Sequence, residues 1–218
     1  MRKAFTTPTP APGPALENEL EALRHINRRL SRQLVRLKRT TVLARHRAGH
    51  DPLTGLATRS LLSDRLEQAF IRAARSATQV AVLLLDLDGF KSVNDRFGHA
   101  AGDGLLRKVA RRLSDCVRAG DTVCRYGGDE FVIVLPDVDP AEVELVAEVV
   151  AQKIRDCLAM PYTIDGAVLG ITVSVGTAIY CNPRQSGAEL IRLADAAMYR
   201  AKASPREARS LGLDASYS

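Results

Sequence analysis

The sequence predicts an α+β domain with one antiparallel sheet and packed helices, preceded by an N-terminal coiled-coil helix. Three observations support this prediction. After residue 50, short apolar runs typical of buried strands alternate with amphipathic segments of helical period. Two such runs flank a Gly-Gly pair, as in a hairpin. Before residue 50, leucines recur every seven residues, which is the spacing of a coiled coil.

The N-terminal segment contains two predicted parts. Residues 1–15 are rich in proline, which interrupts helices, so we expect a disordered leader. A heptad follows, with these residues at its two seam positions: Leu16, Leu23, Leu30 and Leu37, and Leu20, Asn27, Leu34 and Thr41. A single asparagine in a leucine seam favours a parallel two-stranded coil. We therefore expect a dimerisation helix over 16–48, with homodimer contact through 16–44; the alternative is a helix that packs on its own domain.

The basic charge of the chain is confined to its first part. Residues 1–50 hold 11 Lys and Arg against 3 Glu, while the remainder has a net charge of −2. The basic residues are interleaved with the heptad instead of preceding it, so a solvated face is expected and no nucleic-acid partner. The longest apolar run, over residues 80–85, is too short to span a membrane, and we find no signal peptide. We expect a cytoplasmic protein without a membrane partner.

The main domain is expected over 49–206, with a C-terminal tail over 207–218. After a Pro and Gly turn at 51–56, a helix over 60–76 begins with a cap at Thr58 or Ser60. Val, Ala and Leu then predict a buried strand over 79–87. A polar turn or short helix over 89–97 leads to an amphipathic helix over 100–117.

The second half of the domain repeats this alternation. Strands over 121–126 and 131–136 flank the two glycines, and a helix over 140–159 follows. We expect this helix to turn these residues inward: Val143, Val146, Val149, Val150 and Ile154. A strand over 170–180 and a helix over 186–204 complete the domain. The order predicts a ferredoxin-like arrangement, one antiparallel sheet with helices on one face.

The Gly127-Gly128 pair places two acidic residues, Asp129 and Glu130, at a predicted hairpin turn. Glycine is expected there for its access to positive φ. Adjacent carboxylates repel each other, so such a pair indicates a bound cation or a proton-transfer task, although a solvated turn is the alternative. The strand over 79–87 can lie beside this hairpin at the sheet centre, which would bring Asp86 next to the pair.

Three clustered carboxylates predict an oxygen-ligand site for Mg²⁺. Mg²⁺ keeps water and substrate phosphates in its remaining positions, so a nucleoside triphosphate is the expected guest. The sequence has no Walker-type loop, so other backbone amides and lysines would hold the phosphates.

Four blocks carry a resemblance to a known family. They are DPLTGL at 51–56, DLDGFK through GD at 86–103, RYGGDEF at 125–131 and ADAAMYRAK at 194–202. In this order and spacing, residues 50–206 resemble the GGDEF family of bacterial diguanylate cyclases. The resemblance implies a nucleotide-cyclase, palm-type fold. It also implies an enzyme that condenses two GTP molecules into cyclic di-GMP and two pyrophosphates. It also implies a dimer that uses Mg²⁺, with Mn²⁺ as an alternative.

The resemblance also implies roles for individual residues. The metal ligands would be Asp86, Leu87 through its carbonyl, Asp129 and Glu130. The catalytic residues would be Asp129, as base for the 3′-hydroxyl, and Glu130. The substrate-binding residues would be Gly89, Phe90, Lys91, Asn94, Asp103, Leu106, Gly128, Lys202 and Arg206. Asn94 and Asp103 would bind guanine, because a carboxylate can accept from both N1–H and N2–H₂.

A regulatory site is also implied. Arg118 and Asp121 form an RxxD pattern five residues ahead of the glycines, where the family binds cyclic di-GMP as a product inhibitor. The chain departs from the family pattern at Thr58, Pro205 and Glu207. A non-catalytic receptor for GTP or cyclic di-GMP that signals through the N-terminal helix is the alternative function, and a DNA-binding zipper protein is a third.

Overall fold

The computed structural model describes residues 23, 25–36, 49–182 and 184–203. The chain divides into two compact units, Met1–His46 and Arg47–Ser218, which are described separately. The expected leader over 1–15 and tail over 207–218 lie outside the described residues, as do the ends of the expected coiled coil. In the part of the chain that the structure describes, no helix has the length and apolar character needed to cross a membrane.

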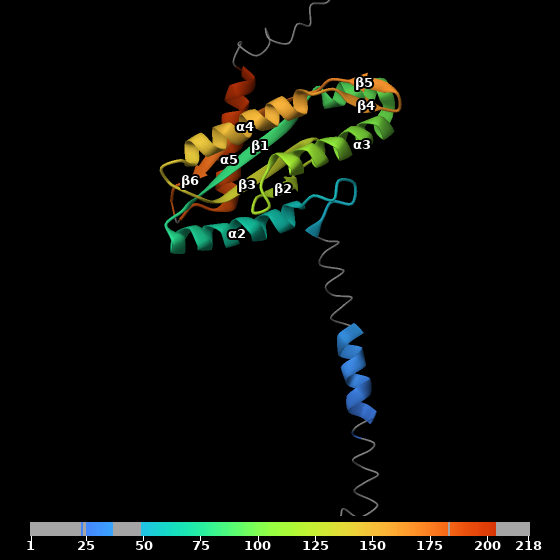
Figure 1. Cartoon of the computed structure of the whole chain (residues 1–218), viewed down its shortest axis with the longest axis vertical. Helices are drawn as coiled ribbons and strands as arrows, with labels where there is room; N and C mark the ends of the chain where they lie inside the picture. Colours follow the sequence, from blue (N-terminus) through green and yellow to red (C-terminus); the bar gives the residue numbers. More distant parts are fainter. Residues whose placement is uncertain (1–22, 24, 37–48, 183, 204–218) are drawn as a thin grey trace, which may run out of the picture. The chain divides into compact units, whose positions relative to one another are not determined.

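Within the first unit, residues 25–36 form a helix, drawn in blue in Figure 1. The heptad residues Leu30 and Leu34 are 53% and 57% exposed in the single chain. The Ser31 hydroxyl donates a hydrogen bond of 3.4 Å to Asn27 Oδ1 on the preceding turn. The predicted helix is therefore confirmed over these residues, and its apolar stripe has no cover within the described chain.

A four-stranded antiparallel sheet forms the centre of the second unit, in the order β2-β3-β1-β6. Its strands are β1 (Gln79–Asp88), β2 (Thr122–Arg125), β3 (Glu130–Val138) and β6 (Thr172–Tyr180). β1 therefore lies between β3 and β6, as Figure 1 shows. Successive side chains of a strand point to opposite faces, and both faces of β1 are buried. The sheet must be covered on both sides.

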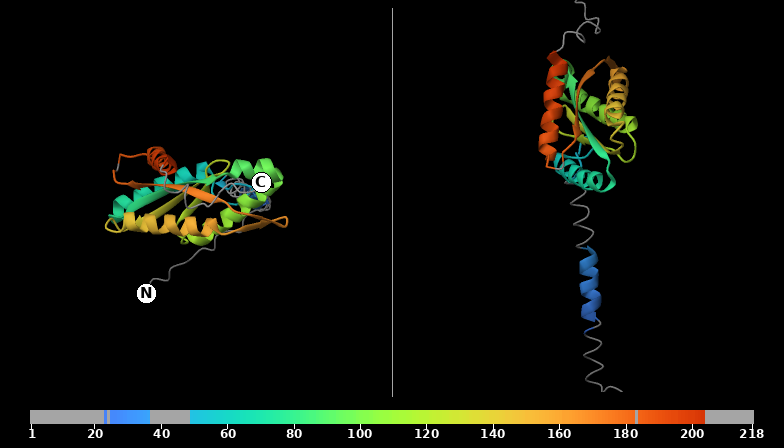
Figure 2. Two further views of the ribbon diagram at one scale, coloured as in Figure 1. Left: turned by 90° about the horizontal axis from the view of Figure 1, so that it is seen from above. Right: turned by 90° about the vertical axis from the view of Figure 1, so that its left-hand side faces the viewer.

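Helices cover both faces of the sheet, as the two views of Figure 2 show. α3 (Phe90–Cys116) and α4 (Val143–Ala159) pack on the face that carries Leu83 and Leu85. α2 (Arg59–Ser76) and α5 (Gly187–Ala203) pack on the face that carries Val82 and Leu84. The antiparallel sheet is confirmed, but the prediction of helices on one face is wrong. An unbroken apolar run in β1 requires cover on both sides.

Three local features differ from the expectations. α3 starts directly at Phe90 and continues past a non-helical residue, Gly98, at φ 81° and ψ 161°. A small hairpin of β4 (Tyr162–Ile164) and β5 (Ala167–Leu169) was not predicted. Its turn residues are Asp165 and Gly166, an Asp-Gly pair with positive φ that is a recognised hairpin signal. Val149, expected to point inward, is 58% exposed.

Close packing of α5 on the sheet depends on Gly176 in β6. A Cβ atom at this position would lie 2.1 Å from the Ala194 carbonyl oxygen and 2.3 Å from the Met198 amide nitrogen. Both are backbone atoms of α5, so no side-chain rotation could relieve the clash. The last helix can approach β6 only because residue 176 has no side chain.

We predict that Gly176→Ala destabilises the domain, because α5 must move away from the sheet. Overpacking of this kind costs about 1–3 kcal/mol in free energy of unfolding, measurable by urea titration. Gly170→Ala is the matched control, since a Cβ there meets no atom within 4 Å. Equal midpoints for the two variants would show that α5 does not rest on this glycine.

Candidate active site

An acidic pair lies at the centre of the sheet, where β1 ends and β3 begins. Asp86 and Glu130 are direct partners in the antiparallel register. Directly opposite residues have Cβ atoms about 4.5–5.5 Å apart. Asp86 lies two residues after Leu84, and Glu130 lies two residues before Val132. Leu84 and Val132 both face α2 and α5, and residues two apart on a strand share a face, so both carboxylates belong to this face. The structure thus confirms that the first strand and the glycine hairpin lie side by side.

The turn before β3 places Asp129 next to this pair. The Leu87 amide donates to the Asp129 carbonyl oxygen at 3.3 Å, and the Tyr126 and Gly127 amides donate to the Glu130 carbonyl oxygen at 2.8 and 3.1 Å. The first bond extends the pairing of β1 with β3, and the other two extend the pairing of β2 with β3 into the turn. The backbone of the turn is therefore fixed on both sides of Asp129.

Glycine at position 127 has a different role from the predicted one, whereas a Cβ at Gly128 would meet no atom within 4 Å. Neither Gly127 nor Gly128 has a positive φ, so that expectation is wrong. A Cβ at Gly127 would lie 2.4 Å from Glu130 Oε2. Gly127 therefore provides the space into which the Glu130 carboxylate folds.

A network of two arginines and one aspartate holds the turn from outside. Arg125 donates from Nε and Nη2 to the Gly128 carbonyl oxygen at 3.2 and 2.8 Å, and from Nη1 to Asp51 Oδ1 at 3.1 Å. Arg59 donates from Nε to the Tyr126 carbonyl oxygen, and its guanidinium lies 3.9 Å from the centre of the Tyr126 ring. Asp51, Arg59 and Arg125 were not among the site residues expected from the sequence, although all three lie in or beside the matched blocks.

Asp51 is the fixed point of this network. Its Oδ1 accepts hydrogen bonds from the Thr54 amide at 2.9 Å and the Thr54 hydroxyl at 2.6 Å, in addition to Arg125. Burial acts to raise the pKa of Asp51, but the bonds from Thr54 and the charge of Arg125 outweigh it and hold the pKa below its ordinary value of 3.8. The carboxylate is therefore ionised at neutral pH.

Lys202 of α5 reaches the acidic pair. Its Nζ donates to Asp86 Oδ1 at 2.7 Å, so the lysine expected to hold phosphate contacts an expected metal ligand in this structure. Asp86 is thus placed to receive a cation. Its carboxylate, that of Glu130 and the Leu87 carbonyl are hard oxygen donors, which suit Mg²⁺. No group of three acidic, His or Cys side chains that could hold a metal occurs in the described part of the chain, so further ligands would come from phosphates and water.

Asp88, two residues after Asp86, forms hydrogen bonds to the neighbouring strand β6. Its carboxylate accepts hydrogen bonds from the Thr172 hydroxyl at 2.9 Å and the Ser174 hydroxyl at 2.7 Å. Both donors belong to β6. Asp88 therefore links β1 to β6 at the end of the sheet where Asp86 lies.

The expected guanine-binding residues lie on either side of the break at Gly98. Asn94 is half-buried before the break, and Asp103 is exposed after it. A Cβ at Gly102 would lie 1.9 Å from Asn94 Oδ1, so the amide of Asn94 rests on the residue that precedes Asp103. The break thus brings the two expected base-binding residues together.

The other expected substrate residues occupy varied positions. Gly89 is the N-cap of α3 with φ 76°, Phe90 is buried and Lys91 is exposed. Leu106 is only 2% exposed and belongs to the core between the sheet and α3. Arg206 lies outside the described residues.

Arg118 and Asp121 meet in the turn between α3 and β2. Arg118 donates from its amide to Asp121 Oδ2 at 3.0 Å and from Nε to Asp121 Oδ1 at 2.9 Å. Its Nη2 donates to the Pro136 carbonyl oxygen at 2.6 Å. The Asp121 side chain is only 3% exposed. The structure thus brings the two RxxD residues into contact and fixes the orientation of the guanidinium.

These features define a class of domain, a ferredoxin-like sheet with two neighbouring carboxylates at its centre. A family model described as "Diguanylate cyclase, GGDEF domain" matches residues 48–208. The chain belongs to the GGDEF family.

Two relatives and one solved structure illustrate the similarity. MucR from Pseudomonas aeruginosa, named as a bifunctional diguanylate cyclase and cyclic di-GMP phosphodiesterase, is 44% identical over 86% of this chain and 26% of its own length. The response regulator PleD from Caulobacter vibrioides is 38% identical over 72% of this chain and 35% of its own. The coiled coil and GGDEF domain of DgcB from Caulobacter crescentus, solved with c-di-GMP, is 30% identical, covers 84% of this chain and 95% of that one, and has a TM-score of 0.73. The chain thus spans about a quarter to a third of the two curated relatives.

We predict that Asp51→Asn destabilises the domain at pH 7 by about 1–3 kcal/mol, because it weakens the bonds to Thr54 and Arg125. The folded pKa is lowered, so this stability is complete above the unfolded pKa of about 4 and is lost as pH falls through the folded value. Urea unfolding of parent and variant at pH 7 and pH 3 should show the difference shrinking. Asp64→Asn, a change to an exposed acid on α2, is the control. A difference in free energy of unfolding between parent and Asp51→Asn that is the same at pH 7 and pH 3 would contradict the role of the ionised carboxylate.

Proposed function

We propose that this protein is a diguanylate cyclase that condenses two GTP molecules into cyclic di-GMP and two pyrophosphates. The observation that carries the proposal is the cross-strand pair of Asp86 and Glu130 with Asp129 on the adjoining turn. An intact acidic site favours catalysis over the alternative of a non-catalytic receptor. The similarity to relatives that are named as diguanylate cyclases supports the same choice.

The residues of the site have separate roles in substrate binding, proton transfer and metal binding. Asn94 and Asp103 orient the guanine, and Lys202 is within reach of the phosphates at the end of β1. The Asp129 carboxylate accepts the proton of the attacking 3′-hydroxyl. Arg125 and the Leu87 amide hold the backbone of its turn, which keeps the carboxylate in position for this transfer. Asp86, Glu130 and the Leu87 carbonyl would hold Mg²⁺, or Mn²⁺ in its place. The ion supplies charge stabilisation at the phosphates.

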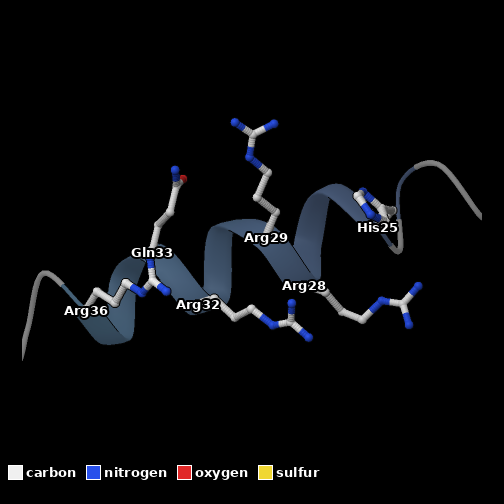
Figure 3. Close-up of a pocket in the computed structure, with 6 residues that line it drawn as sticks. All are labelled: His25, Arg28, Arg29, Arg32, Gln33 and Arg36. Carbon is white, nitrogen blue, oxygen red and sulfur yellow. The ribbon is translucent and has the colours of Figure 1, made fainter.

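The reaction joins two nucleotides, and we propose that each is held by one of two facing domains. The exposed leucines of the helix over 25–36 supply the reason for a dimer. Leu23, Leu30 and Leu34 follow the seam of the heptad, whereas the arginines occupy other positions. Figure 3 shows side chains projecting outward from this helix, with Arg29 and Gln33 on one side and Arg28 and Arg32 on the other. A second copy could cover the leucines while the arginines stay in water.

A coiled coil also occurs in a neighbour of known structure. The DgcB structure contains a coiled coil with its GGDEF domain, and it aligns over 84% of this chain. A parallel dimer would raise the effective concentration of the second half-site. We therefore propose that residues 16–48 form the dimerisation helix of this cyclase, with contact through 16–44, and that 49–206 form its catalytic domain.

The RxxD pair supports product inhibition. Arg118 is held by Asp121 and by the Pro136 carbonyl, and its planar fork suits phosphate and guanine edges. Neighbours solved in complex with c-di-GMP show that domains similar to this one bind the dinucleotide. We propose that cyclic di-GMP binds at Arg118 and Asp121 and limits its own synthesis.

Asp129 is the proposed proton acceptor, so its replacement tests the catalytic proposal. Asp129→Asn removes the proton acceptor while preserving the shape of the side chain, so cyclic di-GMP formation from GTP and Mg²⁺ should fall to background. Chromatographic separation of the nucleotides measures the product, and circular dichroism checks the fold. The control Asp156→Asn makes the same charge change on the exposed face of α4 and should retain activity. Product formation by Asp129→Asn at the parent rate would overturn the proposal.

Another prediction concerns the helix over 25–36. A Leu23→Asn and Leu30→Asn double variant should dissociate the dimer, because polar groups replace two seam leucines. Its activity per molecule should fall steeply on dilution, while light scattering reports the mass. An Arg28→Gln and Arg32→Gln double variant is the matched control off the seam. Activity per molecule that is independent of protein concentration in the leucine variant would remove the helix from the mechanism.

A further inference from the structure

A cavity of about 600 Å³ lies beside Arg118 and Asp121. None of the acidic-pair residues lines it. Its walls come from the opening segment of the domain, from α2, from the end of α3 and from the start of β2. This volume falls within the range of about 300–1,000 Å³ that small-molecule sites occupy. The pocket at the RxxD turn therefore has room for a ligand much larger than a single phosphate.

The two RxxD side chains at this cavity are already paired with each other. Asp121 is almost fully buried and is paired with Arg118, so these two charges offset each other. Two of the donor atoms of Arg118 are already engaged, with Asp121 and with the Pro136 carbonyl. A cyclic dinucleotide carries two phosphate charges on opposite sides of its ring. One partly engaged guanidinium is a poor match for both of them.

Arg65, in the second turn of α2, lines the same cavity. Its side chain is exposed and makes no hydrogen bond or ion pair with any other described residue. Two turns later on the same helix, Arg72 differs, because its Nε lies 3.5 Å from Asp137 Oδ2. Arg65 therefore brings an uncompensated positive charge and a complete set of donors to the pocket.

We propose that Arg65 is a second anion-binding residue of the product-inhibition pocket, contacting the phosphate of cyclic di-GMP that Arg118 does not hold. The proposal rests on the proposed function, because it takes the RxxD pair as the anchor of the dinucleotide. Leu61 and Val117 line the same cavity and provide apolar surface for a purine ring. The pocket then combines a guanidinium group from α2, a second one from the turn after α3, and an apolar surface.

The test is direct binding of cyclic di-GMP, measured by isothermal titration calorimetry on the full chain. All proteins carry Asp129→Asn, so that no product made during expression remains bound. In this background Arg65→Ala should weaken binding about tenfold, the loss expected for one hydrogen-bonded charge. Arg65→Lys should recover part of the affinity, because it keeps the charge but loses the planar fork. The affinity of Arg65→Ala should also depend less on salt concentration than that of the parent.

Two further variants separate the inference from the function it rests on. Arg75→Ala removes an arginine from the last turn of the same helix, outside the cavity lining, and should bind as the parent does. Arg118→Ala should lose most of the affinity. If Arg118→Ala binds weakly but Arg65→Ala binds like the parent, the role of Arg65 is wrong and the RxxD site stands. If neither change affects binding, the proposed product-inhibition site is wrong as well.

Discussion

The antiparallel pairing of β1 with β3 sets Asp86 opposite Glu130, and the site depends on this register. Side chains alternate along a strand, so a slip of one residue would turn Asp86 toward the opposite face of the sheet. The apolar residues that precede Asp86 oppose such a slip, because each is buried under a particular pair of helices. The same packing that stabilises the core therefore determines which face carries the carboxylates.

Residues that touch no reacting atom hold this arrangement in place. Arg125 joins the Gly128 carbonyl to Asp51, and Asp88 joins β1 to two hydroxyls of β6. Gly176 lets α5 come close enough for Lys202 to contact Asp86. A site that holds a reacting nucleotide, as we propose, gains from such rigidity, because small displacements of reacting groups slow a reaction strongly.

The sequence predicted the four strands of the central sheet, most helices and the proximity of Asp86 to the glycine turn, because apolar periodicity and motif spacing are local signals. It did not predict helices on both faces, since the order of elements alone permits either arrangement. The need for glycine at position 127 depends on where the Glu130 carboxylate folds, which only the three-dimensional structure shows. Arg65 was missed for a similar reason, because nothing in the sequence connects it to Arg118, 53 residues later.

The opening segment of the domain contacts both parts of the molecule that bind nucleotides in our proposals. Ala57 donates to the Val123 carbonyl oxygen of β2, accepts from the Arg125 amide, and also lines the cavity at Arg118. Six residues earlier, Asp51 holds Arg125 and through it the turn that carries Asp129. A shift of this one segment would alter both sites, so occupancy of either site and the position of the segment are thermodynamically linked. Such linkage is reciprocal: a dinucleotide that weakens GTP binding must itself bind less tightly, by the same factor, when GTP is present.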